Sequence, residues 1–299
     1  MIWAFDVLLV LALIGVAAHI IWAREHFQAV VLFITFGLLL SMAWSRLNAP
    51  DIAITEAGIG AGLSGVLLMN ALKSGSASRP GLSNKVLACL ILPWACLMSL
   101  LLAWAWDAAL IGSGLGVEVL AALPHAAFEY PVTAVLLDFR TFDTWLELGV
   151  LLAAVFGILG TGFRSGPQGR PDLKPPEPVG TWALNILFPF MILIGGYLLW
   201  LGAFAPGGAF QSGVILAAAG VMLWQSGRPC LAGVPFFWVR VCVVSGFSAF
   251  LLLAVSSLVR SQELLTHPDS KIWILGVEYA ATLSIAACLV ILAENCITK

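Results

Sequence analysis

The most constraining feature of this sequence is a series of nine long apolar blocks, each close to the roughly 20 residues that a helix needs to cross a bilayer. Charged, polar, glycine or proline residues bound each block. The 299 residues are 61% hydrophobic and 10% charged, too little polar surface for a soluble protein of this size. The sequence therefore predicts an all-α polytopic membrane protein with nine transmembrane helices, at residues 2–22, 27–45, 52–73, 86–107, 141–163, 182–202, 207–227, 238–258 and 273–293.

The distribution of lysine and arginine predicts the orientation of these helices. With nine spans, ten of the 14 basic residues fall on one side of the membrane and four on the other. Because basic residues are retained on the cytoplasmic side, the N-terminus is expected outside and the C-terminus in the cytoplasm. The expected location is the inner (plasma) membrane of the cell, with the lipid bilayer as one partner.

Several functional classes have no support in the sequence. The net charge is −2 and no basic aromatic patch suggests a nucleic-acid partner. The six cysteines show no C-x-x-C spacing, and there is no P-loop, dinucleotide fingerprint or Ser/His/Asp set. We therefore expect no enzymatic activity, no metal site and no cofactor in this polypeptide.

The connections between the blocks predict the domain organisation. Residues 163–181 are rich in proline and glycine, which break helices and favour an extended linker. Residues 74–85 form a second polar connection that contains Arg79 and Lys85 and directly follows Lys73. The predicted domains are a three-helix unit at 1–79, a two-helix unit with an outer loop at 80–165, a cytoplasmic linker at 166–181 and a four-helix unit at 182–299.

Ionisable residues inside the spans are the first candidates for function, because burying a charge in hydrocarbon is costly. Three glutamates qualify: Glu56 lies about one turn into the third span, and Glu147 and Glu278 lie about two turns into the fifth and ninth. In the predicted orientation all of them fall in the outer half of the membrane. Glu278 belongs to no motif, but it is included with the ion-path candidates.

The third span begins with an acidic turn and continues with a row of small residues. Asp51 and Glu56 could bind an ion or a proton against a neighbouring helix, or they could be interfacial charges stabilised by a helix N-terminus. Gly58, Gly62 and Gly65 give the helix a small-residue face suited to close packing.

The fifth span opens with charges on one helical face. Arg140, Asp143 and Glu147 are spaced i, i+3 and i+7 and so share that face. They could relay a proton or a cation at the outer mouth of a path. The alternative is an Arg140–Asp143 pair that fixes the helix end, with Glu147 hydrogen-bonded to a neighbour.

The seventh span follows a Pro-Gly-Gly turn. Pro206, Gly207 and Gly208 break the preceding helix, and Gln211 then enters the membrane. Exposed backbone at this depth could contact a cation. A tight hairpin between two spans needs the same residues.

Three segments in these spans resemble segments of one known family. APDIAITEAGIGAGLSGVL resembles the C-terminal extension of the large subunit of Mrp-type multisubunit sodium/proton antiporters, and the matching small subunit of membrane-bound hydrogenases. LLDFRTFDTWLELGVL resembles the segment that follows in both families, and APGGAFQSGVILAAA resembles the signature of the Mrp B subunit. The motifs come in the family's order over nearly the whole chain.

The resemblance implies a fusion of the C-terminal region of an A subunit with a B subunit, serving as an accessory, ion-path subunit of a cation/proton antiporter. It implies other membrane subunits as partners, among them large subunits like those of respiratory complex I, and sodium as an ion that could bind. The residues that match the motifs are Asp51 and Glu56, then Arg140, Asp143 and Glu147, then Pro206, Gly207, Gly208, Phe210 and Gln211.

The chain also departs from the family pattern. Ala209 and Ser212 stand where the B-type pattern usually has glycine, and Leu146 stands where glycine often precedes the matching glutamate. No lysine or arginine lies near a span centre, so the chain is not expected to be the full proton-pumping subunit. The same module in a redox-driven pump of the membrane-bound hydrogenase type, and a purely structural scaffold, stay open as alternatives.

Overall fold

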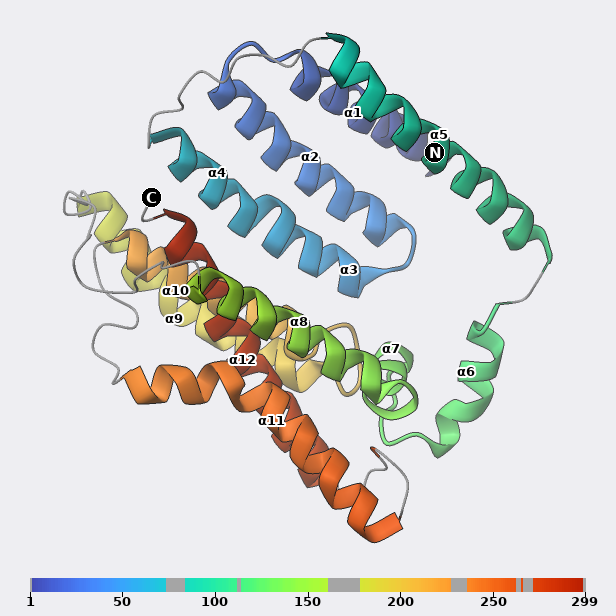
Figure 1. Cartoon of the computed structure of the whole chain (residues 1–299), viewed down its shortest axis with the longest axis vertical. Helices are drawn as coiled ribbons and strands as arrows, with labels where there is room; N and C mark the ends of the chain where they lie inside the picture. Colours follow the sequence, from blue (N-terminus) through green and yellow to red (C-terminus); the bar gives the residue numbers. More distant parts are fainter. Residues whose placement is uncertain are drawn as a thin grey trace. The chain divides into compact units, whose positions relative to one another are not determined.

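The chain folds into helices throughout the part that the structure describes. The computed structural model describes residues 2–73, 84–111, 114–160, 178–226, 236–261, 265 and 271–297. The regular elements in these ranges are α1 (Ile2–Trp22), α2 (His26–Arg46), α3 (Pro50–Thr55), η1 (Glu56–Leu63), α4 (Ser64–Lys73), α5 (Asn84–Ile111), α6 (Gly116–Ala122), η2 (Leu123–His125), α7 (Pro131–Ala134), η3 (Val135–Phe139), α8 (Thr141–Gly160), α9 (Pro178–Leu201), α10 (Ala209–Gln225), α11 (Phe236–Ser261) and α12 (Lys271–Ile297). Figure 1 shows their course.

Seven helical segments in the described residues are long and apolar enough to cross a membrane. They are Trp3–Trp22, His26–Arg46, Pro50–Leu72, Thr141–Gly160, Gly180–Leu201, Phe237–Arg260 and Trp273–Glu294. Shorter apolar helices, Leu92–Ala105 and Ala209–Gln225, lie at the other two predicted spans. The predicted all-α polytopic class is therefore confirmed, whereas the count of nine and the orientation stay predictions.

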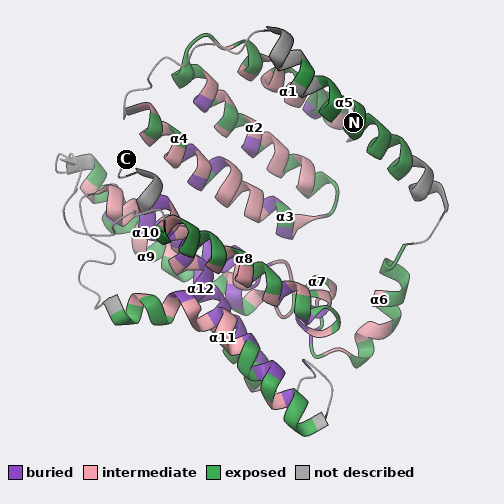
Figure 2. Cartoon of the chain, viewed as in Figure 1, coloured by how far each residue is buried: buried purple, intermediate pink, exposed green. Residues whose placement is uncertain are grey.

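The described chain divides into two compact units, residues 1–74 with 127–299, and residues 75–126. The smaller unit contains α5, α6 and η2. The described side chains of α5 are exposed along its length, as Figure 2 shows in green. The predicted linker at 166–181 lies outside the described residues, except that α9 already begins at Pro178.

Helix α12 is the centre of packing in the larger unit. Of its spanning residues 56% are buried, against 6% in α1. It packs against α8, α10 and α11, and Figure 2 shows the buried residues gathered on α10 and α12. Two apolar clusters join these helices, one of Leu63, Val214, Ala217, Val221, Val290 and Ala293, and one of Val155, Val243, Cys288 and Ile291.

The first three spans form a layer in which α2 is the middle helix. It packs against α1 on one side and against α3, η1 and α4 on the other. An exposed ion pair joins Arg46 to Asp6 of α1, with Nε and Oδ1 2.7 Å apart. The backbone of α2 comes close to η1, because a Cβ at Gly37 would lie 3.0 Å from the backbone nitrogen of Ala61.

Candidate ion-path site

The third span changes its helical winding at the first candidate glutamate. Pro50 stands at the first position of α3, where a missing N–H costs nothing. The backbone then passes into the π-helix η1 at Glu56 and returns to an α-helix at Ser64. Such wide turns are uncommon inside α-helices and are frequent at functional sites. The sequence predicts one regular helix over this span.

Asp51 joins three segments that are far apart in the sequence. The residue is only 7% exposed. Its Oδ2 accepts a hydrogen bond of 2.5 Å from the hydroxyl of Tyr130, and its Oδ1 accepts one of 2.8 Å from the backbone N–H of Gly207. The amide of Gln211 donates to the same Oδ1 and to the backbone oxygen of Asp51, each at 3.4 Å. We call Asp51, Tyr130, Gly207 and Gln211 the Asp51 junction.

The glycines beside this junction build the turn between α9 and α10. The φ angle of Gly208 is +113°, a conformation that L side chains rarely adopt. A Cβ at Gly202 would lie 2.5 Å from the Cα of Gly208, so the backbone at the start of the turn lies close to the backbone at its end. Thr133 of α7 donates a 2.6 Å hydrogen bond to the oxygen of Gly202. The turn is therefore held by α3 through Asp51 and by α7 through Thr133.

The small residues of the third span differ in what they contact. A Cβ at Gly58 would lie 2.5 Å from Cγ1 of Val214 on α10, and one at Gly65 would lie 2.7 Å from Cγ1 of Ile34 on α2. A Cβ at Gly62 would meet only the oxygen of Ala57, at an ordinary 3.4 Å. Gly58 and Gly65 therefore set the distance between helices, whereas Gly62 lies at neither contact.

Glu56 begins the π-helix one turn after Asp51. The side chain is half-buried, and its Oε1 lies over Gly60, where a Cβ would collide with it. Glycine at this position therefore makes room for the carboxylate against its own helix. The η1 segment as a whole packs against α2 and α10.

The charged residues before and in α8 lie at a second break in helical winding. The π-helix η3 ends at Phe139, and α8 begins at Thr141. Arg140 stands between them and pairs with Asp143, with Nη2 and Oδ2 2.5 Å apart. Their side chains are 66% and 42% exposed, so this is a surface pair. Glu147, one turn further, is exposed about two turns into the candidate span Thr141–Gly160.

The structure brings some of the candidates together and separates others. Asp51, Gly207 and Gln211 are in contact. Glu56 and Glu147 lie on helices with different neighbours, since η1 packs against α2 and α10 whereas α8 packs against α11 and α12. Glu278 lies on α12 and is 1% exposed. That Glu56 and Glu147 share one path stays a prediction.

Tyr130 is the functional candidate that the sequence analysis missed. It lies just before Pro131, outside the spans, and its hydroxyl is the shortest contact of Asp51. Burial, and then the hydrogen bond to Asp51, raise the pKa of Tyr130 well above its usual range. A tyrosine before a proline gives no signal that would distinguish it from an ordinary interfacial aromatic residue.

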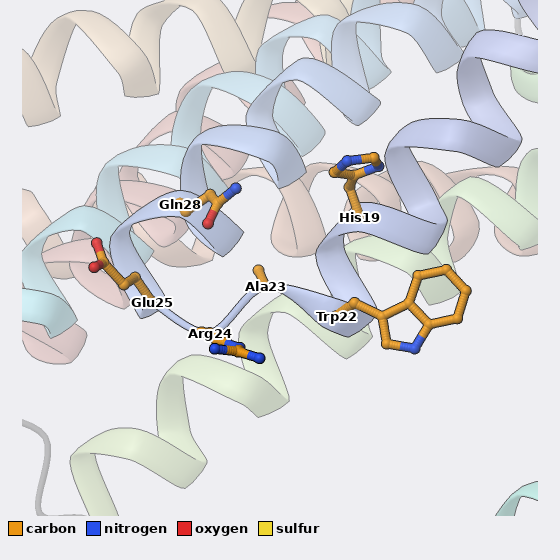
Figure 3. Close-up of a pocket in the computed structure, with 6 residues that line it drawn as sticks. All are labelled: His19, Trp22, Ala23, Arg24, Glu25 and Gln28. Carbon is orange, nitrogen blue, oxygen red and sulfur yellow. The ribbon is translucent and has the colours of Figure 1, made fainter.

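Other kinds of site have little support in the described ranges. No group of three or more His, Cys, Asp or Glu residues there is placed to hold a metal ion. A surface pocket of about 450 Å³ lies at the connection of α1 and α2 (Figure 3). It contains none of the candidates above and is lined by His19, Trp22, Ala23, Arg24, Glu25 and Gln28.

Comparison with known proteins identifies two domains. Residues 11–76 match MbhD, a family of MBH subunits, and residues 180–294 match the family described as "Domain related to MnhB subunit of Na+/H+ antiporter". No curated protein is similar enough in sequence to match the chain.

A solved structure shares the fold over almost the whole chain. It is a chain of the Mrp complex from Dietzia sp. DQ12-45-1b, with a TM-score of 0.75 and 20% sequence identity. The match covers 97% of the present chain and 34% of that one, so this chain spans about a third of its relative. The chain therefore has an MbhD domain and a domain related to the MnhB subunit of Na+/H+ antiporters on one polypeptide, and these two matches support its resemblance to Mrp-type antiporter subunits and their membrane-bound hydrogenase relatives.

Proposed function

We propose that the chain is a subunit of a multisubunit cation/proton antiporter in the cytoplasmic membrane, where it contributes acidic residues to the ion path. Its partners are other membrane subunits, among them large subunits like those of respiratory complex I. The two matched domains support this assignment. The present chain also spans only about a third of the chain from the Mrp complex, which suggests that it is one component of a larger assembly.

The observation that carries the proposal is the Asp51 junction. It ties the start of the third span to the segment before α7 and to the turn before α10. Glu56 follows Asp51 by about one turn on a segment that Gly58 packs tightly against α10. The carboxylate of Glu56 is therefore held on rigid elements, as a selective site requires.

Glu147 supports an ion path at a subunit contact. Its carboxyl group lies within a span and is exposed on the surface of the chain. A charge facing hydrocarbon is expensive, so this group needs water, a cation or a polar partner. Since hard cations take oxygen ligands and protons bind the same carboxylates, sodium and protons would compete at Glu56 and Glu147.

Antiport by the assembled complex in inverted membrane vesicles tests the proposal. Glu56→Gln and Glu147→Gln keep the shape of the side chain and remove its charge, so each should abolish most sodium-dependent proton release while the complex still assembles. Glu129→Gln removes an exposed carboxylate outside the spans and serves as the control. Normal transport by both span variants, with assembly verified in the same membranes, would refute the ion-path role and leave a scaffold.

A second function is favoured by the match of residues 11–76 to the MbhD family of MBH subunits. The same module would then belong to a redox-driven ion pump of the membrane-bound hydrogenase type, and a peripheral arm with nickel or iron–sulfur centres would copurify with it. Purification of the tagged chain from its native membrane, followed by mass spectrometry and metal analysis, separates the two functions. An antiporter predicts membrane subunits without such an arm.

A further inference from the structure

Glu278 is the most isolated carboxyl group among the described residues. The residue is 1% exposed, and neither of its carboxyl oxygens has a hydrogen-bond partner in the structure. The hydroxyl of Thr282, one turn further along α12, donates to the backbone oxygen of Glu278 at 2.8 Å. Because the hydroxyl of Thr282 donates to the backbone oxygen, it does not donate to the carboxyl group of Glu278.

Close contacts fix the depth of Glu278 relative to the helices around it. A Cβ at Gly213 of α10 would lie 2.7 Å from Cγ2 of Ile285 and 3.3 Å from the oxygen of Thr282. A Cβ at Gly246 of α11 would lie 3.0 Å from the Cα of Ala281 and 3.2 Å from Cδ1 of Leu148 on α8. Figure 1 shows α12 passing among these three helices. Glu278 is three residues before Ala281, so it lies about one turn from this layer.

Two further buried polar groups of the larger unit have no partner. Ser212 is fully buried, but its hydroxyl lies toward α9, where a Cβ at Gly195 would be 3.6 Å from it. The indole N–H of Trp145, one turn before Leu148, is also unsatisfied, while its ring packs against Phe247 with centroids 5.4 Å apart. Buried groups of this kind are rare in folded proteins and ask for an explanation. Of the two, Trp145 is the one that lies a turn before Leu148, as Glu278 lies a turn before Ala281, in the layer where α8 and α12 meet at Gly246.

The other described titratable groups on the helices around Glu278 do not bond to its carboxyl oxygens. On α8 these are Asp143, which pairs with Arg140, and the exposed Glu147. Helix α10 carries none, and Tyr197 on α9 is 56% exposed. The remaining groups on described parts of the contacting helices lie on α11 and α12 and are Arg240, Cys242, Arg260, Tyr279, Cys288 and Glu294. None of these side chains forms an ion pair or a hydrogen bond with the carboxyl oxygens of Glu278.

We propose that Glu278 is a proton-binding site inside the four-helix part of the protein, with the indole N–H of Trp145 as its polar neighbour. An ionised carboxylate without a partner costs many kcal/mol in an apolar interior, whereas the neutral acid costs far less. The neutral acid also supplies an acceptor, which can take the N–H of Trp145 through a water molecule. The site is distinct from the Asp51 junction, and the inference does not rest on the proposed transport function.

Infrared difference spectroscopy of the full chain in lipid membranes tests the proposal. A protonated carboxyl group in an apolar site gives a C=O stretch separate from the bands of ionised carboxylates. Glu278→Gln should remove one such band from the wild-type spectrum at neutral pH. Glu129→Gln, which changes an exposed carboxylate, should leave that region unchanged.

The neighbouring residue supplies a second readout. Trp145→Phe keeps an aromatic ring against Phe247 but removes the N–H, so the C=O band assigned to Glu278 should shift to higher frequency and keep its intensity. Dicyclohexylcarbodiimide, which reacts with protonated carboxyl groups in apolar sites, should label the peptide that contains Glu278. An unchanged C=O region in Glu278→Gln, together with no labelling of Glu278 in the wild-type chain, would overturn the proposal.

Discussion

Asp51 and Glu278 are both buried carboxyl groups, 7% and 1% exposed, in opposite surroundings. Asp51 accepts hydrogen bonds from Tyr130, Gly207 and Gln211, whereas the oxygens of Glu278 have no partner. Several donors stabilise an ionised carboxylate, and an apolar pocket stabilises the neutral acid. The comparison teaches that burial alone does not assign a role to an acid in a membrane helix. The donors around it decide whether it fixes the structure or exchanges a proton.

Replacing each carboxyl group should give the largest difference in stability between a change at Asp51 and a change at Glu278. Asp51→Ala leaves buried donors of the Asp51 junction without an acceptor, at about 1–3 kcal/mol each, so the variant should lose several kcal/mol of stability. Glu278→Leu replaces an unsatisfied polar group by an apolar one of similar size, and its stability should change by less than about 1 kcal/mol in either direction. Thermal unfolding of the full chain in one detergent measures both. Equal losses in the two variants would show that the comparison is wrong.

A pair of glycines tests whether the junction depends on close packing of η1 against α10. Gly58→Ala places a methyl group 2.5 Å from Cγ1 of the buried Val214 and should cost about 1–3 kcal/mol. Gly62→Ala meets only an ordinary contact and should be neutral, or stabilising by about 0.5–1 kcal/mol through its helix propensity. The same unfolding measurement applies. A larger loss in Gly62→Ala than in Gly58→Ala would contradict the helix contact described above.

The sequence predicted the architecture well because lipid imposes simple rules on length and hydropathy. Apolar blocks of about 20 residues can only be helices in a bilayer. Seven of the nine predicted spans coincide with helical segments that are long and apolar enough to cross a membrane. The motifs around Asp51 and Pro206 lie within the residues matched to the MbhD and MnhB-related families, whereas the motif around Arg140 lies outside both matches.

The arrangement of the acids was much harder to predict, because it depends on contacts between helices far apart in the chain. Nothing in the sequence pairs Asp51 with Tyr130, which is 79 residues away. An eight-residue stretch of small and apolar residues does not distinguish an α-helix from a π-helix, so the change of winding at Glu56 gave no signal. Glu147 and Glu278 have equal depth in their predicted spans, yet one is exposed and the other buried. Which helices cover them decides that difference.

Tyr130→Phe should weaken the Asp51 junction by a smaller amount, about 1 kcal/mol, because it removes one of the hydrogen bonds. The loss should depend on pH. The folded state raises the pKa of Tyr130, so the unfolded chain, which ionises near pH 10, loses its proton first. The stabilising contribution of the hydroxyl is therefore complete below about pH 10 and is lost as the pH rises above it.

Unfolding of both chains between about pH 8 and about pH 11 measures this effect. The stability difference between wild type and Tyr130→Phe should be constant at the lower pH values and shrink at the higher ones. The other titratable groups are shared by the two chains and cancel in the difference. A difference that grows with pH would mean that ionised Tyr130 is favoured in the fold, which contradicts its contact with Asp51.

The smallest effect is expected at the Arg140–Asp143 pair, the exposed counterpart of the Asp51 junction. Its side chains are 66% and 42% exposed, and exposed pairs contribute about 0.2–1 kcal/mol. A double-mutant cycle with Arg140→Gln and Asp143→Asn should give a coupling energy in that range for the chain alone in detergent, and salt should reduce it. In the assembled complex the coupling should be larger if another subunit covers the start of α8, because burial leaves each unpaired charge without water. The same small value in both states would place this pair at the aqueous surface of the complex, and the exposed face that needs a partner would then begin deeper, at Glu147.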